Sequence, residues 1–195
     1  MNISYRPLGS KWTDRQLADI AGLIYDTDPY IYPAMFSSRE EAVSIIPKMI
    51  IGGDHMFSPE NLFIAEIDDS AIGMILWHRG SMEWDKTKYL ENGGHSPYID
   101  EVNNRYFSSY ATIPSDIVSI LNVCTSVRGK GVGSKILDAF MDRVTGPFEL
   151  YVLAENTVAI ELYKKKGFVI AEVLQGFSIP SRDLPCYKME LNARI

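Results

Sequence analysis

The chain has 195 residues, of which 23% are charged, and its formal net charge at pH 7 is −6. That length favours a single domain spanning residues 1–195, with enough chain to bury a core. The acidic balance argues against nucleic-acid binding, and no run of about 18 apolar residues indicates a membrane span. The two cysteines and three histidines are scattered, so we expect no metal site, no disulfide framework and a cytoplasmic location.

Periodicity in the N-terminal part of the chain predicts both strands and helices. A helix is expected to begin at Thr13 or Asp14, because apolar residues follow at helical spacing. A second helix is expected from Ser38, which has Glu41 three residues on as in a capping box, with Pro47 as a candidate kink. The expected elements are a strand over 2–6, helices over 13–25 and 38–53, and strands over 61–67 and 71–77 joined by a hairpin-like turn.

One stretch beyond the middle of the chain is the most informative. An apolar run over 117–124 leads into three glycines at alternate positions, Gly129, Gly131 and Gly133, and apolar residues at helical spacing follow over 136–144. A helix that begins after such a turn offers backbone N–H groups without internal partners and the positive end of its dipole. Glycines also let a phosphate approach the backbone closely. The stretch therefore predicts a phosphate-bearing ligand.

The spacing of these glycines excludes two common phosphate loops. A Walker loop requires G-x-x-x-x-G-K-[ST], but Gly129 and Gly133 are too close together and the Ser-Lys order is reversed. A dinucleotide fingerprint requires G-x-G-x-x-G, and its third position here is Ser134. The pattern that is left, Arg128-x-x-Gly131-x-Gly133, resembles the acyl-CoA pyrophosphate loop of the GNAT superfamily of N-acetyltransferases. The alternative for the glycines is a tight turn that only joins a strand to a helix.

A second motif lies at residues 150–168, LYVLAENTVAIELYKKKGF. The segment reads as strand, helix and strand, with Gly167 as a helix stop and three lysines complementing the last helical turn. It resembles the second cofactor segment of the same superfamily, N-x-x-A-x-x-L-Y-x-x-x-G-F, and follows the first motif in the family's order. Every fixed position is met, by Asn156, Ala159, Leu162, Tyr163, Gly167 and Phe168.

The resemblance implies the GNAT fold, an α/β (α+β) architecture. We expect a mixed, strongly twisted sheet of six to seven strands flanked by helices, in the order β-α-α-β-β-β-α-β-α-β-β. One departure is an insert of about residues 80–115 between the third and fourth strands, rich in aromatic and acidic residues, in which 98–110 reads as a helix. A functional lid and a packing appendage or dimer contact are both open interpretations of this insert.

The resemblance also implies an enzyme that moves an acetyl group from acetyl-CoA to a primary amine of a small molecule, by direct transfer in a ternary complex. A peptide or protein N-acetyltransferase and a catalytically silent CoA-binding sensor are the alternatives. Acetyl-CoA would be the co-substrate, and the protein a monomer or homodimer. The residues expected to bind the cofactor are Leu121, Asn122, Val123, Arg128, Gly129, Lys130, Gly131, Val132, Gly133, Ser134, Asn156 and Tyr163.

Tyr163 is the expected general acid. A phenol with a pKa of about 10 stays protonated at neutral pH and can protonate a thiolate whose thiol titrates at about 8.5. The resemblance places Tyr163 at the family's proton-donor position, and the alternative is a tyrosine that packs on the sheet. Asn156 has a competing role as a helix N-cap, and Arg128 as a solvated side chain beside the loop.

The general base and the acceptor pocket are less well defined by the sequence. A protonated amine must lose its proton before it attacks, and Asp116, Glu83 and His78 are candidates for receiving it. Tyr30 and Tyr32 lie between the first two predicted helices, where members of the superfamily usually shape the acceptor pocket. We therefore predict Tyr30, Tyr32 and Glu83 as substrate-contacting residues, although a proline-bracketed turn that packs its own tyrosines is an alternative.

Overall fold

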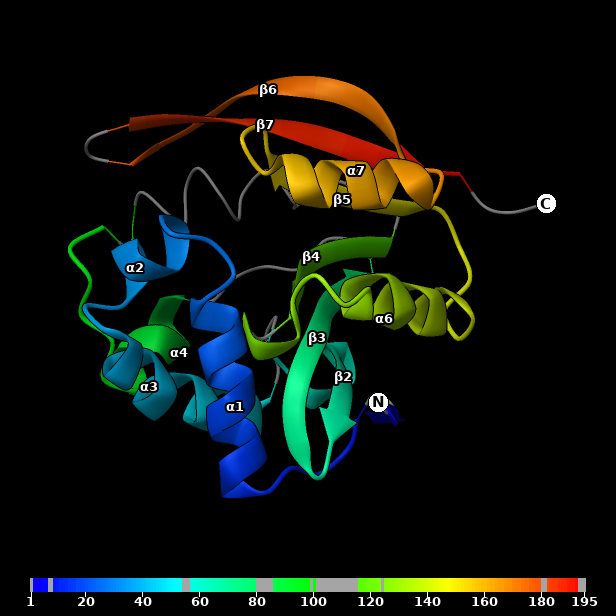
Figure 1. Ribbon diagram of the computed structural model, residues 1–195. Helices are drawn as coiled ribbons and strands as arrows, with labels where there is room; N and C mark the ends of the chain where they lie inside the picture. The colour runs from blue at the N-terminus through cyan, green and yellow to red at the C-terminus, as the bar shows by residue number, and fades with distance from the viewer. Residues whose placement is uncertain are drawn as a thin grey trace.

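The computed structural model describes residues 2–6, 9–53, 57–79, 86–98, 100, 116–123, 125–179 and 182–192. Within these ranges, seven strands form one sheet in the order β1-β2-β3-β4-β5-β7-β6 (Figure 1). The strands are β1 (Ser4–Arg6), β2 (Leu62–Ile67), β3 (Ser70–Arg79), β4 (Asp116–Val123), β5 (Phe148–Leu153), β6 (Val169–Ile179) and β7 (Arg182–Leu191). The helices are α1 (Asp14–Tyr25), α2 (Ile31–Met35), α3 (Arg39–Gly52), α4 (Lys86–Glu91), α6 (Val132–Met141) and α7 (Thr157–Lys165).

The mixed sheet flanked by helices confirms the predicted fold class. Neighbouring strands are antiparallel except β4 and β5, which are parallel and are connected through α6. None of the helices in the described part of the chain has the length and apolar character needed to cross a bilayer.

Local signals in the sequence set the N-terminal elements. Thr13 caps α1 in a full capping box with Gln16, and the Ser38 hydroxyl accepts a hydrogen bond from the Glu41 N–H at the start of α3. Pro47 lies inside α3, which runs as one helix. The β2–β3 hairpin turns through two aspartates with positive φ, which is the geometry of a tight type I′ turn. The predicted strands and helices of this half are therefore confirmed within a few residues.

The segment between α1 and α3 is not the simple turn that its prolines predict. Residues 31–35 form the short helix α2, with Pro33 in its first turn, where a missing N–H breaks no helical hydrogen bond. One carboxylate oxygen of Asp28 accepts from the N–H groups of Tyr30 and Ile31, which starts the helix. Sequence reasoning missed this helix because five residues carry too short a periodic pattern.

The described part of the insert packs against the N-terminal helices. Helix α4 buries Tyr89 completely, with its ring edge-on to Phe36 and its hydroxyl donating to the carbonyl oxygen of Met35. Residues 86–96 are thus a packing appendage in this structure. The helix predicted over 98–110 lies almost entirely outside the described residues, and Glu83 lies outside them as well.

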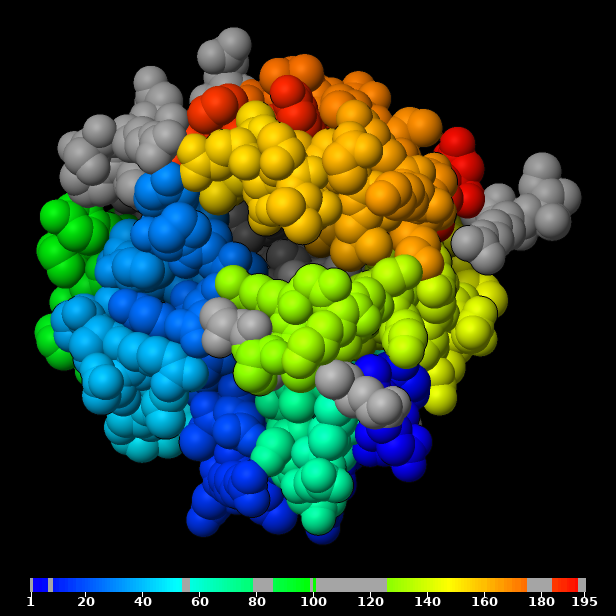
Figure 2. All heavy atoms as spheres, in the orientation of Figure 1, coloured from blue at the N-terminus to red at the C-terminus, as the bar shows by residue number. Residues whose placement is uncertain are grey.

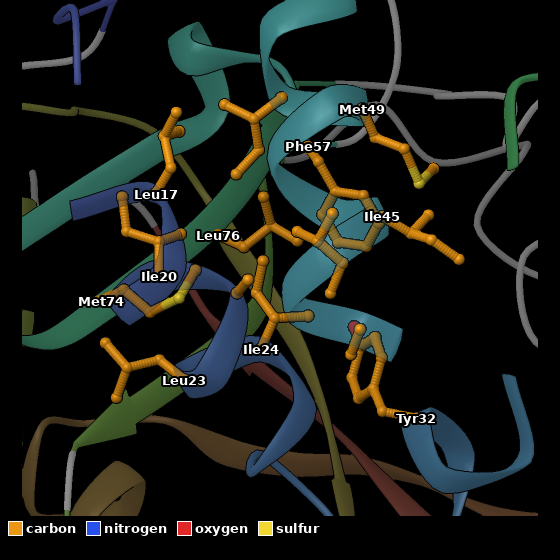
Figure 3. Close-up of a cluster of buried hydrophobic side chains, with 14 of the residues drawn as sticks. Leu17, Ile20, Leu23, Ile24, Tyr32, Ile45, Met49, Phe57, Met74 and Leu76 are labelled. Atoms are coloured by element: carbon orange, nitrogen blue, oxygen red, sulfur yellow. The ribbon is translucent and has the colours of Figure 1, made fainter. Parts of the chain in front are cut away.

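Two hydrophobic cores cover the two faces of the sheet. One core joins α1, α2 and α3 to β2 and β3. Figure 3 shows side chains of α1, α2, α3 and β3 converging in this core. The second core joins α6 and α7 to the opposite face of β2, β3, β5 and β7. In β5 the alternation is regular: Phe148, Leu150 and Val152 belong to the second core, whereas Tyr151 packs against the first.

Candidate active site

The sheet opens between its two parallel strands. β4 and β5 pair only over three residues, and the last pair is Val118 with Leu150. Beyond that point β4 stays paired with β3 as far as Val123, while β5 turns away and pairs with β7 along its whole length. The edge of β4 over residues 119–123 that faces β5 therefore has no strand partner in the described part of the sheet. An extended ligand with amide groups can hydrogen-bond to such an edge.

The loop after β4 leads directly from this open edge to the start of α6. A 3₁₀ turn (Thr125–Val127) is followed by Gly129 and Gly131, with φ of 76° and 73°. At both glycines the space that a side chain would occupy is empty, so the backbone can be approached closely. Gly131 is the N-cap of α6 and supplies no side-chain cap.

Helix α6 begins one residue after Gly131, so Gly133 lies in its first turn and not in the loop as the sequence pattern predicted. Val132, which is 3% exposed, is anchored in the second core and fixes this early start. The N–H groups of the first helical turn have no intrahelical acceptors and lie at the positive end of the helix dipole. Together with the open glycine positions, they form an anion-binding geometry.

The charged and polar side chains of the loop lie at its surface. Arg128 and Lys130 are exposed, and the Lys130 ammonium donates to the carbonyl oxygen of Ser126 at 3.0 Å. Ser134 is half-buried and faces a groove of about 710 Å³ between α6 and α7, which Figure 2 shows as a hollow between the yellow-green and gold segments. The groove is lined by Ser134, Thr157, Val158, Glu161, Leu162, Lys165 and Lys166.

Tyr163 projects from α7 into the second core. Its side chain is only 7% exposed and its ring lies 5.8 Å from that of Phe168. Burial raises the pKa of the Tyr163 phenol well above its ordinary value, so the hydroxyl stays protonated at neutral pH.

Asn156 occupies the N-cap of α7. Its side-chain oxygen accepts from the Ala159 N–H at 3.2 Å, and the residue is exposed. This is the capping role that sequence reasoning gave as the alternative, and the amide N–H₂ group stays available for a ligand. Gly167, with φ of 95°, ends the helix as predicted.

The two predicted acceptor tyrosines have different environments. Tyr32 is 1% exposed and belongs to the first core, as the packing alternative predicted. Tyr30 is half-buried, and its hydroxyl donates to a carboxylate oxygen of Glu155 at 2.7 Å. This hydrogen bond ties the α1–α2 segment to the turn between β5 and α7.

The α1–α2 segment also lies close to β7. Burial and the charge of Asp28, which follows α1, raise the pKa of the Cys186 thiol on β7 to about 11.

A buried polar network on β5 and β7 was missed by sequence reasoning. Glu149 is 2% exposed, and its two oxygens accept from the Tyr151 hydroxyl at 2.5 Å and from the Lys188 ammonium at 3.0 Å. Lys188 also pairs with Glu190 at 2.9 Å. The signal in the sequence was a glutamate inside an otherwise apolar strand, FELYVL, since a buried carboxylate needs dedicated partners.

A family model and solved structures of other proteins point to the same family. The model of the acetyltransferase (GNAT) family matches residues 28–168. An N-acetyltransferase from Staphylococcus aureus Mu50 has a similar fold, with 16% identity and a TM-score of 0.67 over 96% of this chain and 100% of that chain. Arabidopsis thaliana Naa50, solved with the bisubstrate analogue CoA-Ac-MVNAL, has 19% identity and a TM-score of 0.55 over 98% of this chain and 99% of that chain.

A third solved structure, yncA from Salmonella typhimurium with its cofactor acetyl-CoA, has 14% identity and a TM-score of 0.56 over 98% of this chain and 94% of that chain. A search of curated protein sequences found no significant match. The structural likenesses, all below 25% identity, support the fold. Because the family model matches well over half of the sequence, the chain belongs to the acetyltransferase (GNAT) family. It is an acyl-CoA-dependent N-acetyltransferase.

Proposed function

We propose that this protein transfers the acetyl group of acetyl-CoA to the primary amine of a small molecule, within one domain spanning residues 1–195. The observation that carries the proposal is the opening between β4 and β5, whose free β4 edge leads directly into the glycine loop and the start of α6. A long ligand with amides at one end and a diphosphate at the other fits this continuous set of donors and acceptors.

In this proposal each part of the cofactor has its own contacts. The amides of the pantetheine arm pair with residues 121–123, and the diphosphate accepts from the N–H groups of residues 131–134. The adenosine end lies towards the groove between α6 and α7, where Lys165 supplies a positive charge and Asn156 a side-chain amide at the start of α7. Lys166 also lines the groove, although Asp138 already pairs with it at 2.7 Å.

Tyr163 would complete the transfer as the general acid. The acceptor nitrogen attacks the thioester carbonyl, a C–N bond forms and the C–S bond breaks. The thiolate takes the Tyr163 phenolic proton as it leaves. The amine gives up one proton to a base, and the return of that proton to the Tyr163 phenolate completes the cycle. Because burial keeps the phenol protonated, the acid form is present throughout the neutral range.

The contact between Tyr30 and Glu155 supports a small acceptor. Their hydrogen bond closes the α1–α2 segment onto the β5–α7 turn and narrows the approach to the opening from that side. A peptide acceptor would need an extended groove there. The likeness to Naa50, which was solved with a peptide-bearing bisubstrate analogue, makes a peptide N-acetyltransferase the second candidate.

A thiol-release assay tests the proposal. The protein is mixed with acetyl-CoA and, in turn, with spermidine, glucosamine and two five-residue peptides with free N-termini. We expect release of free CoA with at least one of the two small amines, spermidine or glucosamine, and none above background with the peptides. Turnover with peptides alone would establish the second candidate, and acetyl-CoA binding without turnover on any acceptor would establish a sensor.

A further inference from the structure

The Glu149 network lies where the two halves of the sheet separate. Leu150 is the last β5 residue that pairs with β4, and Tyr151 is the next one. Tyr151 is therefore the first β5 residue beyond the point at which the opening begins. Glu149, one residue before that last pair, aligns with Ile117 of β4.

The network also lies on the opposite face of the sheet from Tyr163. Leu150 and Val152 face the second core, which contains Tyr163, whereas Tyr151 packs against the first core. Glu149 shares the face of Tyr151, since it hydrogen-bonds to that residue. The two faces of the sheet beside this point thus differ: one face packs on the core that contains the Tyr163 phenol, and the other carries the Tyr151 phenol with a buried carboxylate.

A buried carboxylate in a strand is costly unless its charge is compensated. Lys188 compensates the charge of Glu149, and Tyr151 supplies its remaining hydrogen bond. Two apolar residues at these positions would pack the face with no such requirement. Core packing therefore does not account for a carboxylate and a phenol at this place.

We propose that Tyr151 accepts the proton of the attacking amine and passes its own phenolic proton to Glu149. The proposal rests on the proposed function. As the C–N bond forms, the Tyr151 oxygen takes a proton from nitrogen, its O–H bond breaks, and that proton moves to the Glu149 carboxylate. Tyr151 is the catalytic residue in this relay, and Glu149 acts through it. Transfer on this face complements donation from Tyr163 to the thiolate on the other.

The surrounding charges are compatible with such a relay. Burial and the neighbouring glutamates raise the pKa of Tyr151, so this phenol works by exchanging protons and not as a phenolate. Burial alone would lower the pKa of Lys188, but its hydrogen bonds to Glu190 and Glu149 raise it, so Lys188 keeps its charge. Glu172 on β6 adds negative charge near Tyr151. On β3, His78 pairs in register with Ile117 of β4, which in turn pairs with Glu149.

The test compares two variants with two matched controls in the thiol-release assay. Tyr151→Phe and Glu149→Gln should each lower kcat by about 100-fold or more at pH 7, with the KM for acetyl-CoA unchanged. Glu190→Gln removes the other carboxylate that Lys188 contacts, and Tyr187→Phe removes a β7 hydroxyl on the Tyr163 side of the sheet. Both controls should keep kcat within about threefold of the wild type, since neither residue is part of the relay.

A pH profile separates proton transfer from packing. Without the relay, turnover depends on the fraction of amine that is already neutral, so the deficit of both variants should shrink between about pH 7 and pH 10. A deficit that is constant over this range, or a Tyr151→Phe enzyme with normal kcat, would overturn the relay alone. A wild type that acetylates none of the acceptors would overturn the proposed function together with it. Tyr151→Phe leaves the Glu149–Lys188 pair in place, so it provides the test if Glu149→Gln fails to fold.

Discussion

Two buried glutamates lie towards opposite ends of the sheet in contrasting surroundings. Glu66 on β2 is 3% exposed, and its oxygens accept from Arg6 at 2.7 Å and from Gln16 at 2.5 Å. Glu149 on β5 is equally buried, but one of its partners is a phenol at the edge of an opening. A guanidinium and an amide hold their protons at neutral pH, whereas a phenol can exchange its proton. Equal burial therefore serves stability around Glu66 and chemistry around Glu149.

The largest expected effect belongs to the glycine loop that follows the open edge of β4. Gly131→Val places a branched side chain at a left-handed position, in the open space that the proposed function assigns to the diphosphate. Losing two charge-assisted hydrogen bonds, worth about 2 kcal/mol each, should weaken acetyl-CoA binding about 1,000-fold. Isothermal titration calorimetry measures the affinity directly.

Gly9→Val is the matched control for this prediction. Gly9 has a φ of 76° and equally open space, but it lies in the segment between β1 and α1. Both variants should lose a similar amount of stability, about 1–2 kcal/mol, because both strain the backbone. If Gly131→Val bound acetyl-CoA as well as Gly9→Val does, the loop would not be the diphosphate site.

The next largest effect concerns the proton for the leaving thiolate. Tyr163→Phe should lower kcat about 100-fold, since general acid catalysis contributes at least that much, while acetyl-CoA affinity stays within a few fold. Stopped-flow detection of thiol release gives kcat. Tyr187→Phe, a tyrosine packed against the same core, serves as control. Equal turnover of the two variants would remove Tyr163 from the mechanism.

The sequence predicts the fold and the local geometry of the glycine loop and of α7 more fully than the packing around the proposed acceptor side. The glycine loop and the α7 motif depend on short-range signals, such as the left-handed Gly131 and the Asn156 cap, which a local pattern can encode. The opening between β4 and β5 depends on where pairing stops between strands separated by a helix, and no local pattern records that point. Glu149 and Lys188 lie far apart in the sequence, so only strand register brings them together.

The smallest expected effect belongs to the surroundings of Glu66 and should appear in stability alone. Glu66→Gln replaces one of the two acceptor oxygens by an N–H₂ group. Either Arg6 or Gln16 then faces a donor in place of its acceptor. Since Arg6 is one-third exposed, water limits the loss to about 2 kcal/mol, or a decrease in Tm of about 4–8 °C.

Glu60→Gln is the matched control. It changes an exposed carboxylate just before β2 and should alter stability by less than about 0.5 kcal/mol. Below the melting transition, kcat of Glu66→Gln should equal that of the wild type. The side-chain partners of Glu66 among the described residues are a guanidinium and an amide, and β3 and β4 separate β2 from β5 in the sheet. A kcat deficit that shrinks with pH, as expected for Glu149→Gln, would show that the two glutamates do not divide stability and chemistry between them.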